Sequence, residues 1–120
     1  MYEVSVRRHF DAAHYLRGYG GKCEELHGHR FEVVVYAQTE VLDEIGLSVD
    51  FREIKDALDD LLRRFDHVCL NDVPPFDSIN PSSENLATEI YGGLAGRLGE
   101  VRISRVEVWE SPDSMAAYIP

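Results

Sequence analysis

Cysteine is scarce in this sequence, and long apolar runs are absent. The chain of 120 residues has two cysteines, Cys23 and Cys69, too few for the disulfide framework of a small secreted protein. Cys69 lies between apolar neighbours and is expected to be a small buried residue. No apolar run approaches the roughly 20 residues that a membrane helix needs. The first residues alternate like a strand and lack the features of a signal peptide, so we expect a cytoplasmic protein.

Basic residues are also few. The sequence has 12 lysines and arginines against 22 acidic residues, which gives a formal net charge of -10. This excess of negative charge argues against nucleic acid or an anionic membrane surface as a partner. It does not argue against a small anionic ligand, because a local site can be positive on an acidic protein.

The apolar pattern predicts strands near the N-terminus, followed by a helix. Alternating residues predict strands over 2–10 and 27–39, and the second, which is apolar on both faces, should be central. A helix should begin at Asp50, which together with Glu53 resembles a capping box. The stripe expected to face inward from this helix comprises Phe51, Ile54, Leu58, Leu61, Leu62 and Phe65.

The second half of the chain adds another helix and two more strands. A helix is expected from Ser82 or Ser83, with Gly99 as its stop signal. Strands are predicted over 101–109 and 115–119. A bulge is expected in the first of these, because the alternation of its apolar residues shifts by one position between Ile103 and Val106.

The order strand, strand, helix, helix, strand, strand is typical of an α+β domain. A chain of this length fits one domain, over residues 1–120. Segregated helices between strand pairs predict a four-stranded antiparallel sheet with two helices on one face. Such a sheet has two exposed edges, which proteins commonly protect by joining further subunits, so we expect an oligomer.

Three histidines are the strongest candidate for a functional site. His27 and His29 are two residues apart at the start of a strand, so both imidazoles project from the same face. If the first two strands pair as a hairpin, His14 lies opposite His27 and His29. Three histidines leave the fourth tetrahedral position open, which is the arrangement of a catalytic zinc and not of a structural one.

Cys23 precedes the histidine pair and has two alternative roles. As a fourth ligand it would close the metal site and make it structural. As a free thiol it would be reactive, because a nearby cation lowers the pKa of a thiol. The spacing between Cys23 and His27 permits both roles.

Asp66 and His67 follow the first predicted helix, beyond its apolar stripe. They could serve as a proton relay and the residue that orients it, or His67 could simply cap the carboxyl end of the helix.

Two glutamates are candidates for substrate binding. Glu110 ends a predicted strand beside an aromatic residue, where a carboxylate can accept two N–H donors from an amino-heterocycle or can simply face solvent. Glu84 opens the second helix, where glutamate is also favoured by the helix dipole.

Taken together, these segments resemble the 6-pyruvoyl-tetrahydropterin synthase family, and within it the branch that serves queuosine biosynthesis. The resemblance covers nearly the whole chain. Each motif is modest alone, but six in the right order are highly specific. The motifs are F-D-A-A-H at 10–14, C-E-E-L-H-G-H at 23–29, V-D-F-R-E-I-K at 49–55, F-D-H-V-C-L-N-D at 65–72, N-P-S-S-E-N at 80–85 and V-W-E-S at 108–111.

The resemblance implies a fold, an assembly and a role for each candidate residue. The fold would be the tunnelling fold, whose subunits trimerise into a barrel, and two trimers would stack into a homohexamer. Zn²⁺ would be the cofactor and a pterin triphosphate the substrate. The implied zinc ligands are His14, His27 and His29, the implied catalytic residues are Cys23, Asp66 and His67, and the implied pterin-binding residues are Glu110 and Glu84.

Three functions follow as hypotheses. The first is a zinc-dependent lyase that converts 7,8-dihydroneopterin triphosphate to 6-carboxy-5,6,7,8-tetrahydropterin, acetaldehyde and triphosphate. The short interval between Cys23 and His27 is similar to that of the queuosine-type enzymes and favours this reaction. The second is a sister synthase that eliminates triphosphate and makes 6-pyruvoyl-tetrahydropterin. The third is a non-catalytic, zinc-stabilised assembly protein. For the triphosphate, Arg17, Lys22 and Arg30 are unranked candidates.

Overall fold

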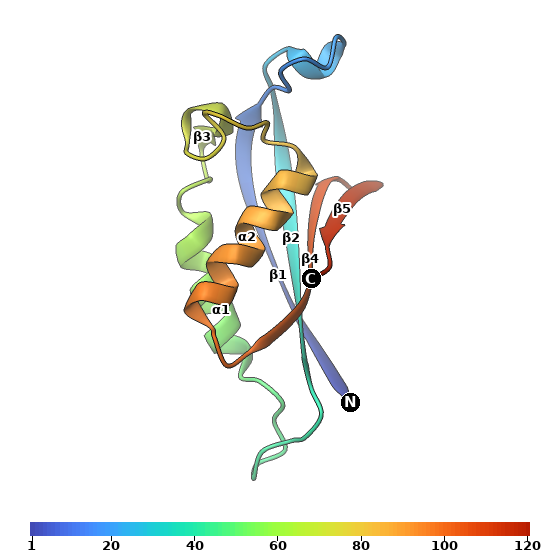
Figure 1. Cartoon of the computed structure of the whole chain (residues 1–120), viewed down its shortest axis with the longest axis vertical. Coiled ribbons are helices and arrows are strands. Elements are labelled where there is room, and N and C mark those ends of the chain that lie inside the picture. Colours follow the sequence, from blue (N-terminus) through green and yellow to red (C-terminus); the bar gives the residue numbers. More distant parts are fainter.

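The computed structural model describes all residues from 1 to 120 and contains one sheet with two α-helices. In Figure 1 the strands run along the long axis of the molecule and both helices lie beside them. No helix is both long and apolar enough to cross a membrane. The elements are β1 (Tyr2–His14), a 3-10 turn (Lys22–Glu24), β2 (His27–Thr39), α1 (Phe51–Leu62), β3 (Val68–Cys69), a second 3-10 turn (Leu70–Asp72), α2 (Ser83–Arg97), β4 (Arg102–Ser111) and β5 (Ser114–Tyr118).

The sheet has five strands in the order β3-β1-β2-β4-β5. The pairs β1–β2, β2–β4 and β4–β5 are antiparallel, as predicted, but β3 pairs with β1 in parallel. The prediction of four strands in a purely antiparallel sheet was therefore wrong. β3 has two residues, and a strand of that length is too short to show alternation in the sequence.

The pairing of β1 with β2 places the candidate histidines together. Thirteen residues of each strand pair without interruption, from Tyr2 opposite Thr39 to His14 opposite His27. The first strand was predicted to end at Phe10, but it continues through Asp11 to His14 because its main chain still finds partners on both sides.

The predicted bulge in the third long strand is confirmed. Tyr36 of β2 pairs with Arg105, whereas the next residue, Ala37, pairs with Ile103. Ser104 is therefore the extra residue in β4. The bulge returns the apolar residues of β4 to one face of the sheet, since Ile103, Val106 and Val108 are all buried.

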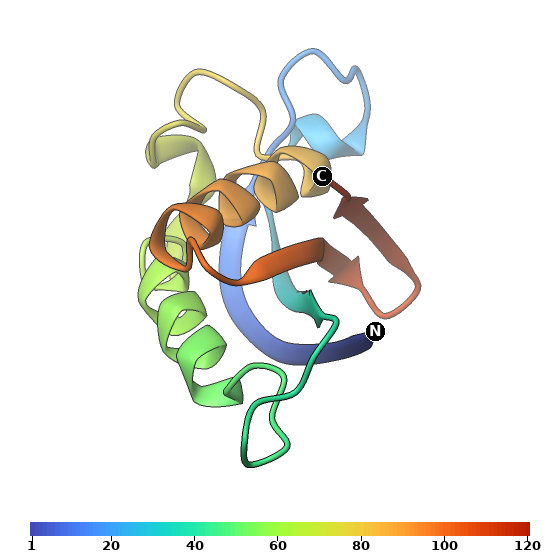
Figure 2. The ribbon, with the colours of Figure 1, turned by 60° about the horizontal axis from the view of Figure 1, so that its bottom comes forward.

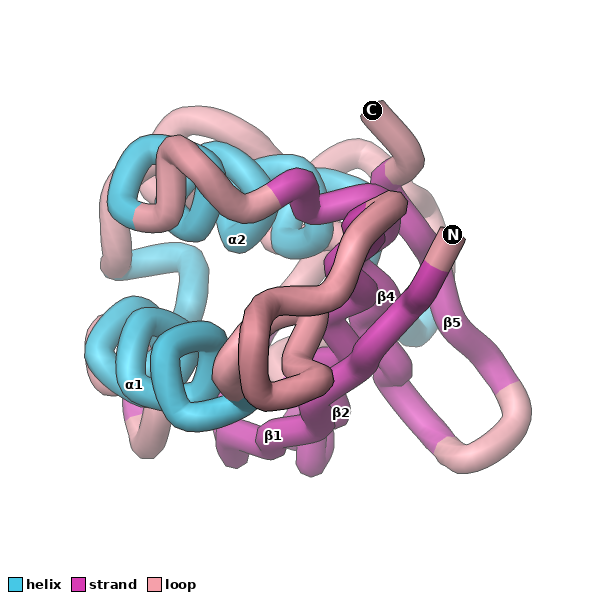
Figure 3. Tube along the Cα trace, turned by 90° about the horizontal axis from the view of Figure 1, so that it is seen from below, coloured by secondary structure: helices cyan, strands magenta, loops and turns pink.

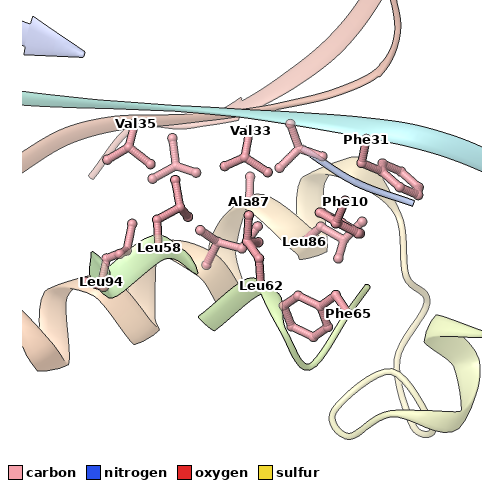
Figure 4. Packing of buried hydrophobic residues seen from close by; sticks show 14 of the residues in the cluster. Phe10, Phe31, Val33, Val35, Leu58, Leu62, Phe65, Leu86, Ala87 and Leu94 are labelled. Carbon is pink, nitrogen blue, oxygen red and sulfur yellow. The ribbon is translucent and has the colours of Figure 1, made fainter. Parts of the chain in front are cut away.

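Both helices cover the same face of the sheet, as Figure 3 shows. Their apolar residues meet those of β1, β2 and β4 in a cluster of 22 buried side chains. Figure 4 shows Phe10 and Phe31 at one end of this core and Leu94 at the other. The prediction that Phe51 faces inward was wrong, because 48% of it is exposed at the first turn of α1.

Both helices begin where their capping residues predict. The side chain of Asp50 accepts a hydrogen bond from the main-chain N–H of Arg52, and that of Ser82 accepts one from Asn85. The second cap fixes the first turn of α2, which carries Glu84, beside the end of the sheet.

Candidate metal centre

The three histidines lie together at one end of the sheet, on the face that the helices cover. His14 is directly opposite His27 across the β1–β2 pair, and His29 is two residues further along β2. Side chains two residues apart point to the same face, so the rings continue the row that begins with Phe31 in the core. The ring centroids lie 4.6 Å apart for His14 and His27, and 4.7 Å for His27 and His29.

Glu110 joins the histidines from β4. One ligand atom from each of His14, His27, His29 and Glu110 lies within 4.8 Å of the others. The glutamate Oε1 is 3.2 Å from Nε2 of His14 and 3.0 Å from Nε2 of His29. The sequence suggested Glu110 as a pterin-binding residue, and its place beside the imidazoles was not anticipated.

The donor atoms of this cluster fit a metal ion. The Nε2 atoms of His14 and His29 are buried and have no partner in hydrogen-bonding geometry. Buried polar atoms are nearly always satisfied, and the acceptor beside these two nitrogens is the carboxylate of Glu110, whose Oε1 they share at 3.0–3.2 Å without hydrogen-bonding geometry. A cation between them would satisfy all three atoms. Imidazole nitrogens with one carboxylate are a donor set that suits zinc and other divalent transition metals.

Main-chain carbonyls fix the orientation of two of the rings. Nδ1 of His14 lies 2.8 Å from the carbonyl oxygen of Pro81, and Nδ1 of His27 lies 2.7 Å from that of Glu25. A carbonyl can only accept a hydrogen bond, so each Nδ1 carries the proton and leaves the Nε2 lone pair free. Nothing in the sequence signals these contacts, because every residue has a carbonyl.

Burial favours the neutral form of His14 and of His29. It is the main cause that lowers the pKa of His14 and of His29 below the ordinary value for histidine, and the neighbouring imidazoles lower it further. Glu110 acts in the opposite direction on both. Neutral imidazole is the form that binds metals.

Cys23 lies in the 3-10 turn between β1 and β2 and is half-buried. It is free, and it does not belong to the group of four close ligand atoms, in which Glu110 takes the fourth place. The Cys23 turn is attached to the end of β1, because the main-chain N–H of Leu16 donates to the carbonyl oxygen of Cys23 at 2.6 Å. The arrangement therefore favours a free thiol over a fourth ligand.

Glu84 and Glu110 line one small cavity. Its volume is about 150 Å³, and it lies between the start of α2 and the β4–β5 hairpin. The two carboxylates that the sequence suggested for substrate binding thus come together beside the histidines, since Glu110 borders both. Ser83, Ser114, Met115 and Ala116 complete the lining.

Asp66 and His67 form a second group, in the turn after α1. Nδ1 of His67 lies 2.9 Å from Oδ2 of Asp66, whose Oδ1 accepts the main-chain N–H of Asp11 at 2.9 Å. The hydrogen bond from Asp11 is the main cause that lowers the pKa of Asp66, and His67 lowers it further. His67 adopts φ +59° and donates its main-chain N–H to Asp11, so it does not cap α1.

Within one chain the ligand atoms of this pair and those of the histidine cluster form two distinct groups, although His29 and His67 border one cavity. Asp11 points away from the core, on the opposite side of β1 from Phe10 and Ala12. Asp11 and His67 line a cavity of about 570 Å³, which Cys69 also borders. Cys69 is half-buried, so the expectation of a small buried residue was wrong.

Both arginines suggested for the triphosphate already have partners. The guanidinium of Arg17 donates to the carbonyl oxygens of Phe76 at 2.9 Å and Ile79 at 3.2 Å. Arg30 lies 2.7 Å from Nε2 of His9. Lys22 makes no side-chain hydrogen bond or ion pair, which leaves it as the freest of the three cations.

Comparison with known proteins identifies relatives along nearly the whole chain. The sequence model of the family described as 6-pyruvoyl tetrahydropterin synthase matches residues 3–120. A 6-carboxy-5,6,7,8-tetrahydropterin synthase from Synechocystis is 39% identical over 91% of this chain and 86% of its own. A dihydroneopterin monophosphate aldolase from Pyrococcus furiosus is 34% identical over 89% of this chain and 88% of its own.

Solved structures agree with this relationship. The 6-pyruvoyl tetrahydropterin synthase of Caenorhabditis elegans superposes with a TM-score of 0.86 and 26% identity, and covers 100% of this chain and 97% of its own. The Plasmodium falciparum structure of the same description has a TM-score of 0.78 at 21% identity over 98% of this chain and 96% of its own, which supports the fold alone.

Proposed function

Because the chain belongs to the 6-pyruvoyl tetrahydropterin synthase family, we propose that it is a zinc-dependent lyase of queuosine-precursor synthesis. It would convert 7,8-dihydroneopterin triphosphate and one water molecule to 6-carboxy-5,6,7,8-tetrahydropterin, acetaldehyde and triphosphate. The observation that carries the proposal is the cluster of His14, His27 and His29 beside a cavity lined by Glu84 and Glu110. The likeness to the synthase from Synechocystis supports the choice of product.

The three histidines would hold the zinc through their Nε2 atoms, with a coordination position left for substrate. When bound, the metal would supply Lewis-acid stabilisation of the negative charge that develops on the substrate oxygens after proton loss. Glu110 would leave the histidines and bind the pterin ring, because its carboxylate borders the cavity as well as the metal centre.

Glu110 and Glu84 would orient the pterin. A carboxylate can accept two parallel hydrogen bonds from the amino and ring N–H groups of a pterin, which fixes the plane of the ring. The cavity between α2 and the β4–β5 hairpin brings both carboxylates to one place. Holding the ring there would direct the substrate side chain toward the histidines.

Cys23 would exchange the proton of the substrate side chain. The thiolate is the reactive form of a cysteine. Asp66 would hold His67 in one orientation through their 2.9 Å contact, and His67 would move protons to and from the site.

Cooperation between Cys23 and His67 would require more than one chain. The Asp66–His67 group and the histidine cluster are distinct groups of the same subunit. A neighbouring subunit at an edge of the sheet would bring its own Asp66–His67 pair to the site. A homohexamer of two stacked trimers provides such neighbours.

The experiment that tests the proposal is product analysis after incubation of the zinc-loaded protein with 7,8-dihydroneopterin triphosphate. We expect acetaldehyde and a 6-carboxypterin in equal amounts. Formation of 6-pyruvoyl-tetrahydropterin without acetaldehyde would instead establish the sister synthase, which the likeness to the Caenorhabditis elegans structure supports. Untouched substrate would overturn both. A parallel reaction with dihydroneopterin monophosphate tests the activity named for the Pyrococcus furiosus relative.

A further inference from the structure

Beyond the end of β1, two asparagine side chains take the place of a neighbouring strand. The parallel pairing with β3 ends at Ala13, and the main chain continues toward Cys23. The side-chain amide of Asn71 then bonds both main-chain groups of Tyr15, at 3.0 Å each. The amide of Asn80 bonds both main-chain groups of Arg17 in the same way, at 2.9 Å each.

The residue between these two contacts faces the turn that carries Cys23. In an extended chain, successive residues direct their main-chain groups to opposite sides. Tyr15 and Arg17 therefore face the asparagines, whereas Leu16 donates its N–H to the carbonyl oxygen of Cys23 at 2.6 Å. The segment 15–17 thus links the asparagine amides to the Cys23 turn.

Asn80 is also connected to the rest of the site. Its carbonyl oxygen accepts a hydrogen bond from the side chain of Asn85 in α2 at 2.9 Å. The carbonyl oxygen of the next residue, Pro81, lies 2.8 Å from Nδ1 of His14. Figures 1 and 2 show the two loops involved, one from β1 to β2 and one leading into α2, at the same end of the molecule.

We propose that Asn80 is a positioning residue, which holds the Cys23 turn, His14 and the first turn of α2 in one relative geometry. The role in catalysis rests on the function proposed above. An amide is required at this position because it presents both a donor and an acceptor, and the main chain of Arg17 offers one of each.

The position is suited to this role because Asn80 is only half-buried. Asn71, by contrast, is 4% exposed, so replacing it would leave buried main-chain groups unpaired and weaken the fold. Loss of the Asn80 amide exposes its partners to water and allows the loops to move without unfolding the core. A small displacement at a reacting group is enough to reduce turnover strongly.

The test compares Asn80→Asp, which keeps the shape but loses the donor, with Arg64→Gln as a matched control. Arg64 lies 3.3 Å from the carbonyl oxygen of Pro74 in the same connection but contacts neither Asn80 nor Arg17. Asn80→Ser is the second variant, because it removes the amide without adding a charge. All proteins carry Cys69→Ala, so that alkylation by iodoacetamide reports on Cys23 alone.

We expect both Asn80 variants to keep their melting temperature within a few degrees and to retain zinc. Cys23 should be alkylated several-fold faster than in the parent, and kcat should fall by at least about tenfold with a smaller change in KM. Arg64→Gln should match the parent in both measurements.

Two results would overturn the proposal, and a third would separate it from the lyase function. Alkylation and kcat equal to those of Arg64→Gln would overturn the proposal while leaving the lyase function intact. Unfolding of both Asn80 variants at the assay temperature would show a purely structural residue and would overturn it too. If the parent makes no product but both Asn80 variants alter Cys23 alkylation, the lyase proposal fails and the positioning of the Cys23 turn by Asn80 is supported.

Discussion

At the scale of single residues, the histidine centre depends on which nitrogen of each ring is free. Pro81 and Glu25 hold Nδ1 of His14 and His27 through their carbonyl oxygens, so each Nε2 lone pair points into the cluster. The carbonyl partners come from two loops, not from the strands that carry the rings. The histidine cluster is therefore built from the sheet, whereas the orientation of two of its rings is set by the loops around it.

The pairing of Asp66 predicts a pH-dependent contribution to stability. The folded pKa of Asp66 lies below its ordinary value, mainly because the main-chain N–H of Asp11 donates to it. Because its pKa is lowered on folding, the ionised carboxylate stabilises the folded state at pH values above the pKa of the unfolded chain, near 4. This stabilisation is lost as the pH falls through the pKa of Asp66 in the folded state. Asp66→Asn should therefore lower the melting temperature at pH 7, on the order of 2 °C.

Melting curves between pH 2.5 and pH 7 check this expectation. The difference between parent and Asp66→Asn should shrink as the pH falls and vanish at the acid end. Asp56→Asn is the matched control, because the Asp56 side chain makes no hydrogen bond or ion pair. An equal difference at both ends of the pH range would contradict the role given to the Asp66 carboxylate.

At the scale of elements, adjacent glycines of α2 have opposite environments. A Cβ added to Gly93 would lie 2.9 Å from Cδ1 and 3.0 Å from Cδ2 of Leu61 in α1, whereas one added to Gly92 would meet nothing within 4 Å. Gly92→Ala should stabilise the protein by up to about 1 kcal/mol through helix propensity. Gly93→Ala displaces Leu61 from its packed position and should be about 1–2 kcal/mol less stable than Gly92→Ala.

Chemical denaturation of the two variants measures this difference directly. The two substitutions change the same helix by the same methyl group, so the contact with Leu61 is what separates them. Equal stabilities would show that α1 and α2 do not approach each other at Gly93.

Elements with many periodic residues could be predicted from the sequence, and short or polar ones could not. Periodicity located β2, both helices and the bulge in β4, because burial of one face imposes a regular pattern. β3 was missed because two residues cannot alternate. The end of β1 was missed because Asp11 is polar, and its place in the strand depends on main-chain pairing with Arg30 and on Asp66.

The candidate site, too, could be predicted from the sequence only in part. The spacing of His27 and His29, with a hairpin to bring in His14, predicted the cluster that the structure contains. The pairing of β4 is irregular both at Ser104 and between Trp109 and Ser111. The face of the sheet to which Glu110 points could therefore not be predicted from alternation in the sequence. The bonds of Asn71 and Asn80 to the main chain depend on how two loops meet, and no local pattern encodes that meeting.

At the scale of the whole molecule, the chain is elongated and its sheet ends in exposed edges. The principal extents are 53 × 24 × 21 Å, and β5 has no further strand beside it. An unpaired edge is a template for pairing with another chain. We expect a homohexamer, measured by light scattering as six times the chain mass of 13.6 kDa. A monomer at micromolar concentration would contradict both this assembly and the sharing of Asp66 and His67 between subunits.

The most direct test of the account is the metal content of the purified protein and of two variants, measured by elemental analysis. We expect one zinc ion per chain in the parent and in Cys23→Ala, and strongly reduced zinc in His27→Ala, whose half-buried position allows the fold to survive. Full zinc in His27→Ala, or loss of zinc in Cys23→Ala, would contradict a three-histidine metal centre with a free thiol beside it.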